Sequence, residues 1–147
     1  MYEERLWPPT WAWLATTAFA ATLGFAFWVP YGPTVGLAVG AAAVGLTLVG
    51  LVGASGRVGL GQGVLRAGRA RLPVSVVSAV TALDESAAHD LLGAGADARA
   101  FLFQRGWVRT AVRLDLDDPQ DQVPYWFVST RRPHDLAAAV EAARESG

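Results

Sequence analysis

The chain has 147 residues, of which 52% are hydrophobic, and a formal net charge of −1 at pH 7. It contains no cysteine, which excludes disulfide bonds, thiolate metal sites and cysteine nucleophiles. The near-neutral balance also lacks the strongly basic domain that is typical of nucleic-acid-binding proteins, so we expect no nucleic-acid partner.

The first third of the chain is dominated by a stretch without charge. No Asp, Glu, Lys or Arg occurs among the 51 residues between Arg5 and Arg57. The stretch contains two apolar runs, of 19 and 21 residues, separated by the sequence PYGP at residues 30–33. A helix needs about 20 apolar residues to cross the hydrocarbon core of a bilayer. The pattern therefore predicts a hairpin of two transmembrane helices over residues 11–54, preceded by a short N-terminal segment, residues 1–10.

Two other interpretations of the apolar runs fit less well. A cleaved signal peptide has a basic start and an apolar core of about 7–15 residues, whereas this chain begins MYEERLWPP and has a second run. A buried hairpin of a soluble protein would show a polar stripe on each helix, and neither run has one. Trp11, Trp13 and Trp28 lie at the ends of the first run, as in the aromatic belts of membrane helices.

The arginines predict the orientation of the hairpin. Arg57, Arg66, Arg69 and Arg71 follow the second run closely, and the loop between the runs carries no charge. Positive residues concentrate on the cytoplasmic side of membrane helices. All 12 basic residues are arginine, a composition typical of GC-rich bacterial genomes. We therefore expect a multi-pass protein of the bacterial cell membrane with both termini in the cytoplasm.

The second run carries glycines at the spacing of close helix contacts. Gly36 and Gly40 form a GxxxG motif, and Gly45 lies on a neighbouring line of small residues. Small residues at this spacing allow two helix backbones to approach closely. The tethered first helix is the expected partner of this face, and a homodimer through it is the alternative.

Short β-like segments follow the second run, over residues 55–147. They predict a small α+β domain in the cytoplasm, in which a β-barrel-like sheet is capped by a C-terminal helix. The expected elements are a hairpin that turns at Gln62–Gly63, β-rich residues 69–83, a short helix or loop at 84–95, strands at 105–116 and 125–130, and a terminal helix at 133–144.

The expected strand at residues 105–116 alternates between an apolar and a polar face, and Arg105, Arg109 and Arg113 share the polar one. A neighbouring strand with acidic residues would make this row a cross-strand ladder of charges. The residues from Ser55 onward contain 11 arginines and 11 acids, so pairing within the domain is the default expectation. Arg109 and Arg113 are also candidates for an anion- or partner-binding surface.

Four aspartates cluster around the turn that follows this strand: Asp115, Asp117, Asp118 and Asp121. A calcium-binding EF-hand loop needs Gly at its sixth position and Glu at its twelfth, and counting from Asp115 these positions hold Gln120 and Trp126. Asp and Pro are the usual residues of turns. We therefore predict a structural turn, with no metal site, no cofactor and no catalytic residue.

The strand that ends at Thr130 runs into the terminal helix with Arg131 and Arg132 at the joint. Free backbone N–H groups make the start of a helix positive, so two arginines there are unfavourable unless an anion lies close. That anion could be the chain's own turn at residues 115–121, a lipid phosphate or an acidic patch of a partner. We predict that this joint is the functional surface of the domain, with internal pairing as the simpler interpretation.

Three blocks of the sequence carry a family resemblance: YEERLWPPTWAW, VLRAGRARLPVSVV and RGWVRTAVRLDLDDPQDQVPYWFVSTRRPHDLAAAV. Over nearly the whole chain they resemble an actinobacterial family of small membrane proteins, domain of unknown function 3093 (DUF3093). The residues after the hairpin also resemble bacterial pleckstrin-homology-like (PH-like) domains, which are partly open barrels capped by one helix. The resemblance implies this architecture and supplies no activity. The turn GQG at residues 61–63 lacks the basic residues of lipid-binding pleckstrin-homology domains, so phosphoinositide binding of that type is not implied.

Several functions are compatible with this architecture. We favour a membrane-anchored interaction module that recruits another membrane or cytoplasmic protein, because no nucleophile–base pair or ligand set has usable spacing. An anionic lipid headgroup is a further candidate ligand. The alternatives are a small membrane enzyme that acts on lipid headgroups, with the acidic turn holding Mg²⁺, and an accessory subunit that stabilises a larger membrane complex.

Overall fold

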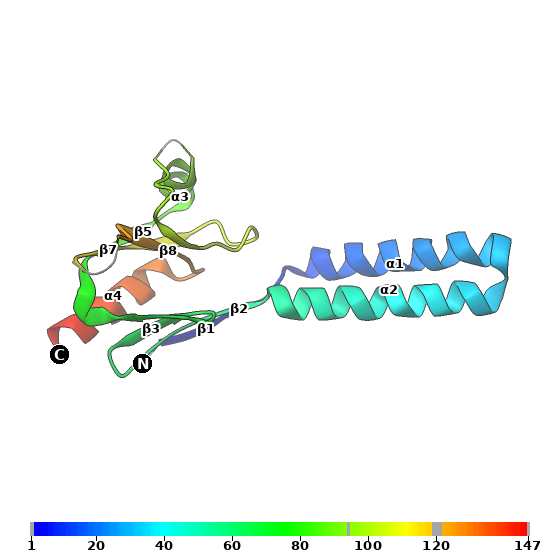
Figure 1. Cartoon of the computed structure of the whole chain (residues 1–147), viewed down its shortest axis with the longest axis horizontal. Helices are drawn as coiled ribbons and strands as arrows, with labels where there is room; N and C mark the ends of the chain where they lie inside the picture. The colour runs from blue at the N-terminus through cyan, green and yellow to red at the C-terminus, as the bar shows by residue number, and fades with distance from the viewer. Residues whose placement is uncertain (1, 94, 119–121, 147) are drawn as a thin grey trace. The chain divides into compact units, whose positions relative to one another are not determined.

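The computed structural model describes residues 2–93, 95–118 and 122–146. The chain divides into two compact units (Figure 1). The helical unit spans Trp7–Ser55, and the sheet domain combines the N-terminal strand with the residues from Gly56 onward.

The helical unit consists of two apolar helices, α1 (Thr10–Tyr31) and α2 (Pro33–Ala54). Each has 22 residues, enough to cross a membrane by length and composition. The helices are joined at Gly32, whose φ of 86° is easily reached only by glycine. The prediction that PYGP ends the first helix is confirmed, since α1 passes through Pro30 and ends at Tyr31, within this sequence. Pro33 begins α2, a position that proline suits.

The helical unit is inserted between two neighbouring strands of one sheet. Strand β1 (Tyr2–Leu6) pairs antiparallel with β2 (Gly56–Gly61), so that Leu6 lies opposite Gly56. Residues 1–10 were expected to form a segment of their own, whereas Tyr2–Leu6 belong to the sheet domain. The sequence signal for this strand is an alternation with a period of two. Tyr2, Glu4 and Leu6 are buried on one face, and Glu3 and Arg5 lie on the opposite face.

The strands of the described residues form two four-stranded sheets rather than one closed barrel. The first sheet has the order β1-β2-β3-β4, with β3 at Val64–Ala67 and β4 at Ala70–Pro73. The predicted hairpin is confirmed, since β2 and β3 turn at Gln62 and Gly63, both with positive φ. A short 3-10 helix, Val74–Val76, leads from β4 to the second sheet.

The second sheet has the order β5-β7-β8-β6. Its strands are β5 (Val77–Leu83), β6 (Phe101–Phe103), β7 (Ala111–Leu116) and β8 (Tyr125–Ser129). Strand β6 was not predicted, and it is parallel to β8. The strand predicted over residues 105–116 begins only at Ala111, because the chain turns before it: the N–H of Val108 donates to the carbonyl of Arg105 at 2.8 Å.

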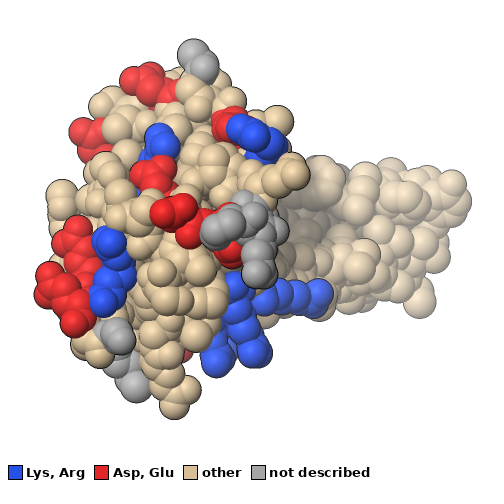
Figure 2. All heavy atoms as spheres, turned by 60° about the vertical axis from the view of Figure 1, so that its left-hand side comes forward, with Lys and Arg blue, Asp and Glu red and all other residues tan. Residues whose placement is uncertain are grey.

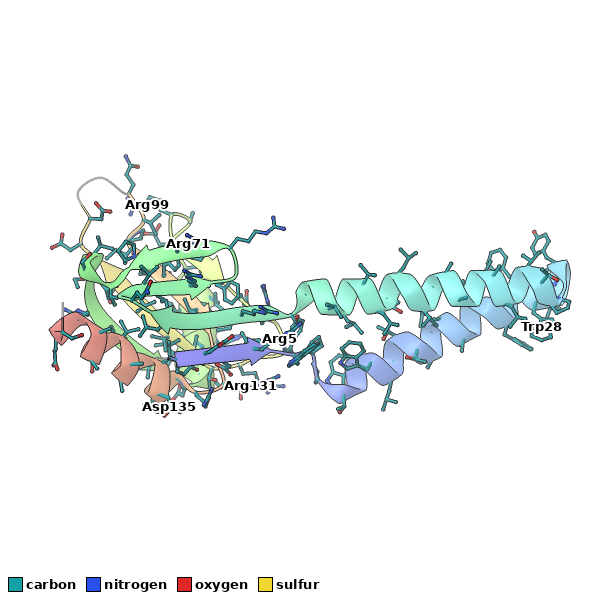
Figure 3. The ribbon with its side chains drawn as sticks, turned by 90° about the horizontal axis from the view of Figure 1, so that it is seen from below. Arg5, Trp28, Arg71, Arg99, Arg131 and Asp135 are labelled. Atoms are coloured by element: carbon teal, nitrogen blue, oxygen red, sulfur yellow. The ribbon has the colours of Figure 1, made fainter. Side chains whose placement is uncertain are left out.

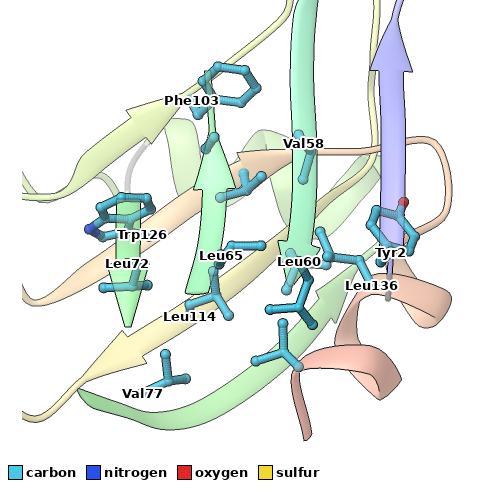
Figure 4. Packing of buried hydrophobic residues seen from close by; sticks show 14 of the residues in the cluster. Tyr2, Val58, Leu60, Leu65, Leu72, Val77, Phe103, Leu114, Trp126 and Leu136 are labelled. Carbon is cyan, nitrogen blue, oxygen red and sulfur yellow. The ribbon is translucent and has the colours of Figure 1, made fainter. Parts of the chain in front are cut away.

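The main hydrophobic core lies between the two sheets and the terminal helix α4 (Pro133–Glu145). Figure 4 shows Val58, Leu65 and Tyr2 from the first sheet packed with Leu114 from the second and Leu136 from α4. A second, smaller cluster lies on the other face of the second sheet. There, residues of the short helix α3 (Glu85–Leu92) pack against the sheet. The second sheet is therefore covered on both faces, and the first on one.

Candidate functional site

The joint between β8 and α4 is built around a buried glutamate. The side chain of Glu4 is almost fully buried, and three donors converge on it. The Tyr2 hydroxyl donates to Oε2 at 2.8 Å, the Thr130 hydroxyl donates to the same oxygen, and the backbone N–H of Arg131 donates to Oε1 at 3.2 Å. Residues that are more than 120 positions apart in sequence are thereby joined at one point.

Glu4 brings a carboxylate from β1 to the start of α4, in addition to Asp135 in the first turn of the helix itself. The anion predicted from the sequence for this role was the acidic turn or an external anion, and Glu4 was not predicted. The period of two in β1 was the available signal, because it puts Glu4 on the same face as Tyr2 and Leu6. Burial raises the pKa of Tyr2 above its ordinary value of 10.0, an effect that its bond to Thr130 partly offsets. The hydroxyl is therefore held in its neutral, donating form.

The predicted surface residues at the joint differ in their exposure. Thr130 is fully buried, and its hydroxyl accepts the backbone N–H of Arg132 at 3.1 Å. Arg131 and Arg132 have exposed side chains, and Figure 3 shows Arg131 beside β1 and the start of α4. The guanidinium group of Arg132 lies over the Tyr2 ring, 5.2 Å from its centroid. The joint therefore presents two cationic side chains above a polar interior that is already hydrogen-bonded.

The arginines of the predicted row do not form a cross-strand ladder. Arg109 pairs with Glu85 in the first turn of α3, at 2.6 Å. Arg113 pairs with Asp115 of its own strand, also at 2.6 Å, and its guanidinium group stacks over the Tyr125 ring. Both pairs lie within the domain, which agrees with the default expectation of internal pairing.

A groove of about 840 Å³ lies between α3 and the segment at residues 104–109. Its polar lining includes Glu85, His89, Asp90 and Arg109, and the nearly inaccessible ring of Phe127 lies at its base. The carboxyl group of Asp84, at one end of the groove, caps α3 by accepting the N–H of Ala87, and this bond lowers its pKa.

This groove was not predicted from the sequence. Its two walls are separated by more than ten residues in the chain, and the turn at residues 105–108 that forms one wall replaced the first half of a predicted strand. His89 and Asp90 are neighbours on an eight-residue helix that the sequence left open as a helix or a loop.

The acidic turn is only partly covered by the structure. Residues 119–121, including Asp121, lie outside the described residues. The N–H of Asp117 donates to the carbonyl of Val76 at 2.9 Å, and that of Leu116 to the carbonyl of Pro124 at 3.0 Å. Within the described part of the chain, no three His, Asp or Glu side chains gather as a metal ion requires.

The glycines of the predicted packing motif differ from one another. A side-chain carbon on Gly36 would lie 2.7 Å from Trp28 Cβ and 2.8 Å from the carbonyl oxygen of Gly24, both on α1. At Gly40 the nearest atom would be Gly24 Cα at 3.5 Å, an ordinary contact. At Gly45 no atom lies within 4 Å. Gly36 and Gly40 therefore face the chain's own first helix, and Gly45 faces open space.

Comparison with known proteins gives a family but no relative of known activity. No curated protein and no solved structure matches the chain. One family model, described as "Protein of unknown function (DUF3093)", matches residues 1–140. The match includes the inserted helices, both sheets and the start of α4, so it covers the joint and the groove as well as the apolar hairpin. The chain therefore belongs to the DUF3093 family.

Proposed function

We propose that the protein is a membrane-anchored module that holds its sheet domain at the cytoplasmic surface and recruits another protein there. The main support for this proposal is the exposure of apolar side chains in the helical unit. Only 11% and 6% of the most apolar stretches of α1 and α2 are buried within the chain. Large side chains such as Trp11, Phe25 and Leu46 are at least two-thirds exposed. Helices that are apolar on every side need a lipid environment.

The topology of the first sheet supports a hairpin with both ends on one side of the membrane. Strands β1 and β2 are hydrogen-bonded neighbours, so the chain leaves and re-enters the sheet domain at adjacent positions. Only Trp7–Pro9 and Ser55 separate these strands from the helices. The arginines that follow α2 favour the cytoplasm for that side.

The groove beside α3 is the surface that we assign to a protein partner. It combines apolar floor atoms with polar walls, as ligand sites usually do. Glu85 and Arg109 neutralise each other, so Asp90 and Asp84 leave the groove with an acidic character. The partner that suits it is a protein segment with a basic side chain beside an apolar one.

The joint is the second surface of the proposal. The backbone N–H of Arg131 already donates to Glu4, and the hydroxyl of Thr130 is used internally. A ligand would therefore meet the side chains of Arg131 and Arg132 rather than the start of the helix. An acidic segment of the same partner suits these two guanidinium groups.

The groove assignment can be tested by site-specific photo-crosslinking in native membranes. A photoreactive amino acid at Ser86 or Gln104, on the two walls of the groove, should give a discrete crosslinked protein. The same amino acid at Thr81, an exposed position of β5 outside the groove lining, serves as the control.

The acidic character of the groove allows a second test. Asp90→Arg should abolish the crosslink from Ser86, because it reverses the charge that a basic partner meets. Equal crosslinks from Ser86 and Thr81, or a crosslink that survives Asp90→Arg, would contradict the assignment of the groove.

A further inference from the structure

The exposed face of the first sheet is unusually rich in arginine. The alternation of β1, β2, β3 and β4 points the following residues to that face: Glu3, Arg5, Arg57, Arg66 and Arg71. Arg69 is exposed in the tight turn between β3 and β4, next to Gly68 with its φ of 63°. This set of five arginines and one glutamate is called the arginine face below.

The strand register places the arginines directly opposite one another. Arg5 is the partner of Arg57 across β1 and β2, and Arg66 is the partner of Arg71 across β3 and β4. Like charges at directly opposed positions of an antiparallel pair destabilise the sheet. The Arg66–Arg71 pair is therefore unfavourable by itself and becomes favourable when an anion lies against it.

Four arginines of this face, Arg57, Arg66, Arg69 and Arg71, differ in their pairing from several other arginines of the domain. Among the described residues, Arg99, Arg109 and Arg113 each form an ion pair with an acid, and none of the arginines from 57 to 71 does. The reason lies in the sequence: residues 55–83 contain four arginines and no acidic residue, whereas every acid of the domain after β1 comes from Asp84 onward.

The sheet domain is therefore close to neutral as a whole but divided in charge. In Figure 2, a group of blue arginine side chains gathers at the lower side of the sheet domain, whereas blue and red side chains alternate over much of the rest of that view. Figure 3 labels two members of the arginine face, Arg5 and Arg71, on the ribbon of the first sheet.

We propose that the arginine face binds the phosphate groups of anionic lipids in the membrane that holds the hairpin. The inference rests on the membrane anchor of the proposed function and adds a ligand class to it. Guanidinium groups bind phosphate through paired hydrogen bonds, and cytoplasmic leaflets carry a negative surface potential.

Because the first sheet follows the helical hairpin directly in the chain, lipid headgroups are always available to the arginine face. Arg57 follows the last residue of α2, Ala54, by three positions, which span at most about 10 Å of extended chain. Arg66 and Arg71 belong to the same sheet as Arg57. A lipid headgroup at the end of the hairpin is therefore present at high local concentration wherever the protein is inserted.

The test uses a single fluorescent label on the face, which the absence of native cysteine makes simple. Gly61→Cys places the label on the same side of β2 as Arg57, at a position where a side-chain carbon meets no atom within 4 Å. The full-length protein is reconstituted in vesicles of phosphatidylcholine, with or without phosphatidylglycerol, and quenched with acrylamide, which carries no charge. Thr81→Cys is the control label.

We expect the label at residue 61 to be several-fold less accessible to acrylamide in the vesicles with phosphatidylglycerol, and the label at residue 81 to be unchanged. Arg66→Gln with Arg71→Gln should weaken the docked state on the order of thirtyfold and restore quenching. Arg99→Gln with Arg144→Gln removes the same charge elsewhere and should leave the protection intact.

The outcomes separate this inference from the proposed function. If alkaline carbonate releases the protein from the vesicles, the membrane anchor itself is wrong. If the protein stays inserted but quenching at residue 61 is equal in both lipids, or is unaffected by Arg66→Gln with Arg71→Gln, the lipid inference alone is overturned. Protection that occurs in native membranes and not in phosphatidylglycerol vesicles would assign the face to an acidic protein and would also overturn it.

Discussion

The second sheet has hydrophobic residues packed on both of its faces, whereas the first sheet packs on one face and exposes the other. The arginines of the two sheets differ in their surroundings. Arg113 of the second sheet is half-buried and forms an ion pair with Asp115, whereas Arg66 of the first sheet is exposed and lies opposite Arg71. A sheet that is covered on both faces stabilises the fold. A sheet with one exposed, charged face can stabilise the fold and also bind a ligand.

The largest effect should come from the covered sheet. Phe127 on β8 is 2% exposed and packs in the cluster beneath α3. Phe127→Ala should lower the free energy of unfolding of the sheet domain by about 3–5 kcal/mol, through lost burial and a cavity. Hydrogen exchange of the domain amides in nanodiscs measures this. A loss as small as that of a surface substitution would mean that α3 does not cover the sheet.

The next effect concerns the inward face of the first sheet. Glu4→Ala removes the acceptor of three donors, two of them buried hydroxyls that can still bond each other. We expect a loss of about 2–3 kcal/mol, since a buried donor without an acceptor is costly. The matched control is Glu3→Ala on the adjacent outward position, which should stay within about 0.5 kcal/mol. A loss of stability in Glu4→Ala as small as that in Glu3→Ala would mean that both glutamates lie in solvent.

A smaller, pH-dependent effect belongs to the same cluster. The raised pKa of Tyr2 means that the folded state holds the phenolic proton more tightly than the unfolded state does. Its contribution is fully present below pH 10 and is lost as the pH rises through the folded pKa. The decline in stability above pH 10 should therefore be shallower in Tyr2→Phe than in the natural chain. An equally steep decline in Tyr2→Phe and in the natural chain would contradict this expectation.

The smallest effect is expected on the arginine face. Arg66→Gln should leave the stability within about 0.5 kcal/mol of the natural chain, or raise it slightly, because it removes a like-charge pair. Arg113→Gln should cost about 0.5–1 kcal/mol, since it breaks an ion pair and a contact over the Tyr125 ring. Thermal unfolding in vesicles of phosphatidylcholine compares the two. A larger loss for Arg66→Gln would make the arginine face structural.

Much of the architecture could be predicted because it follows from local pattern. The charge-free runs predicted α1 and α2, and Gln62–Gly63 predicted the first turn. The terminal helix expected at residues 133–144 corresponds to α4. The pairing of β1 with β2 could not be found in this way. Its partners are separated by the whole helical unit, and a five-residue strand next to a long apolar run carries little signal of its own.

The candidate sites were harder to predict, for two physical reasons. Glu4 acts through residues that are more than 120 positions away, so no local spacing reports it. The arginine face was hidden by the neutral total of the residues from Ser55 onward, because a total does not distinguish the two faces of a strand. Counting the outward residues of β2, β3 and β4 separately would have shown the excess.

The central claim is that the apolar helices form a hairpin across the membrane with the sheet domain on its cytoplasmic side. Single cysteines at Tyr31, next to the turn between the helices, and at Ser86, on the sheet domain, test it in intact bacterial cells with a thiol reagent that does not cross the cytoplasmic membrane. We predict that the cysteine at residue 31 reacts in intact cells and that the cysteine at residue 86 reacts only after the membrane is permeabilised. Reaction of residue 86 in intact cells, or equal reaction of both residues, would contradict the account.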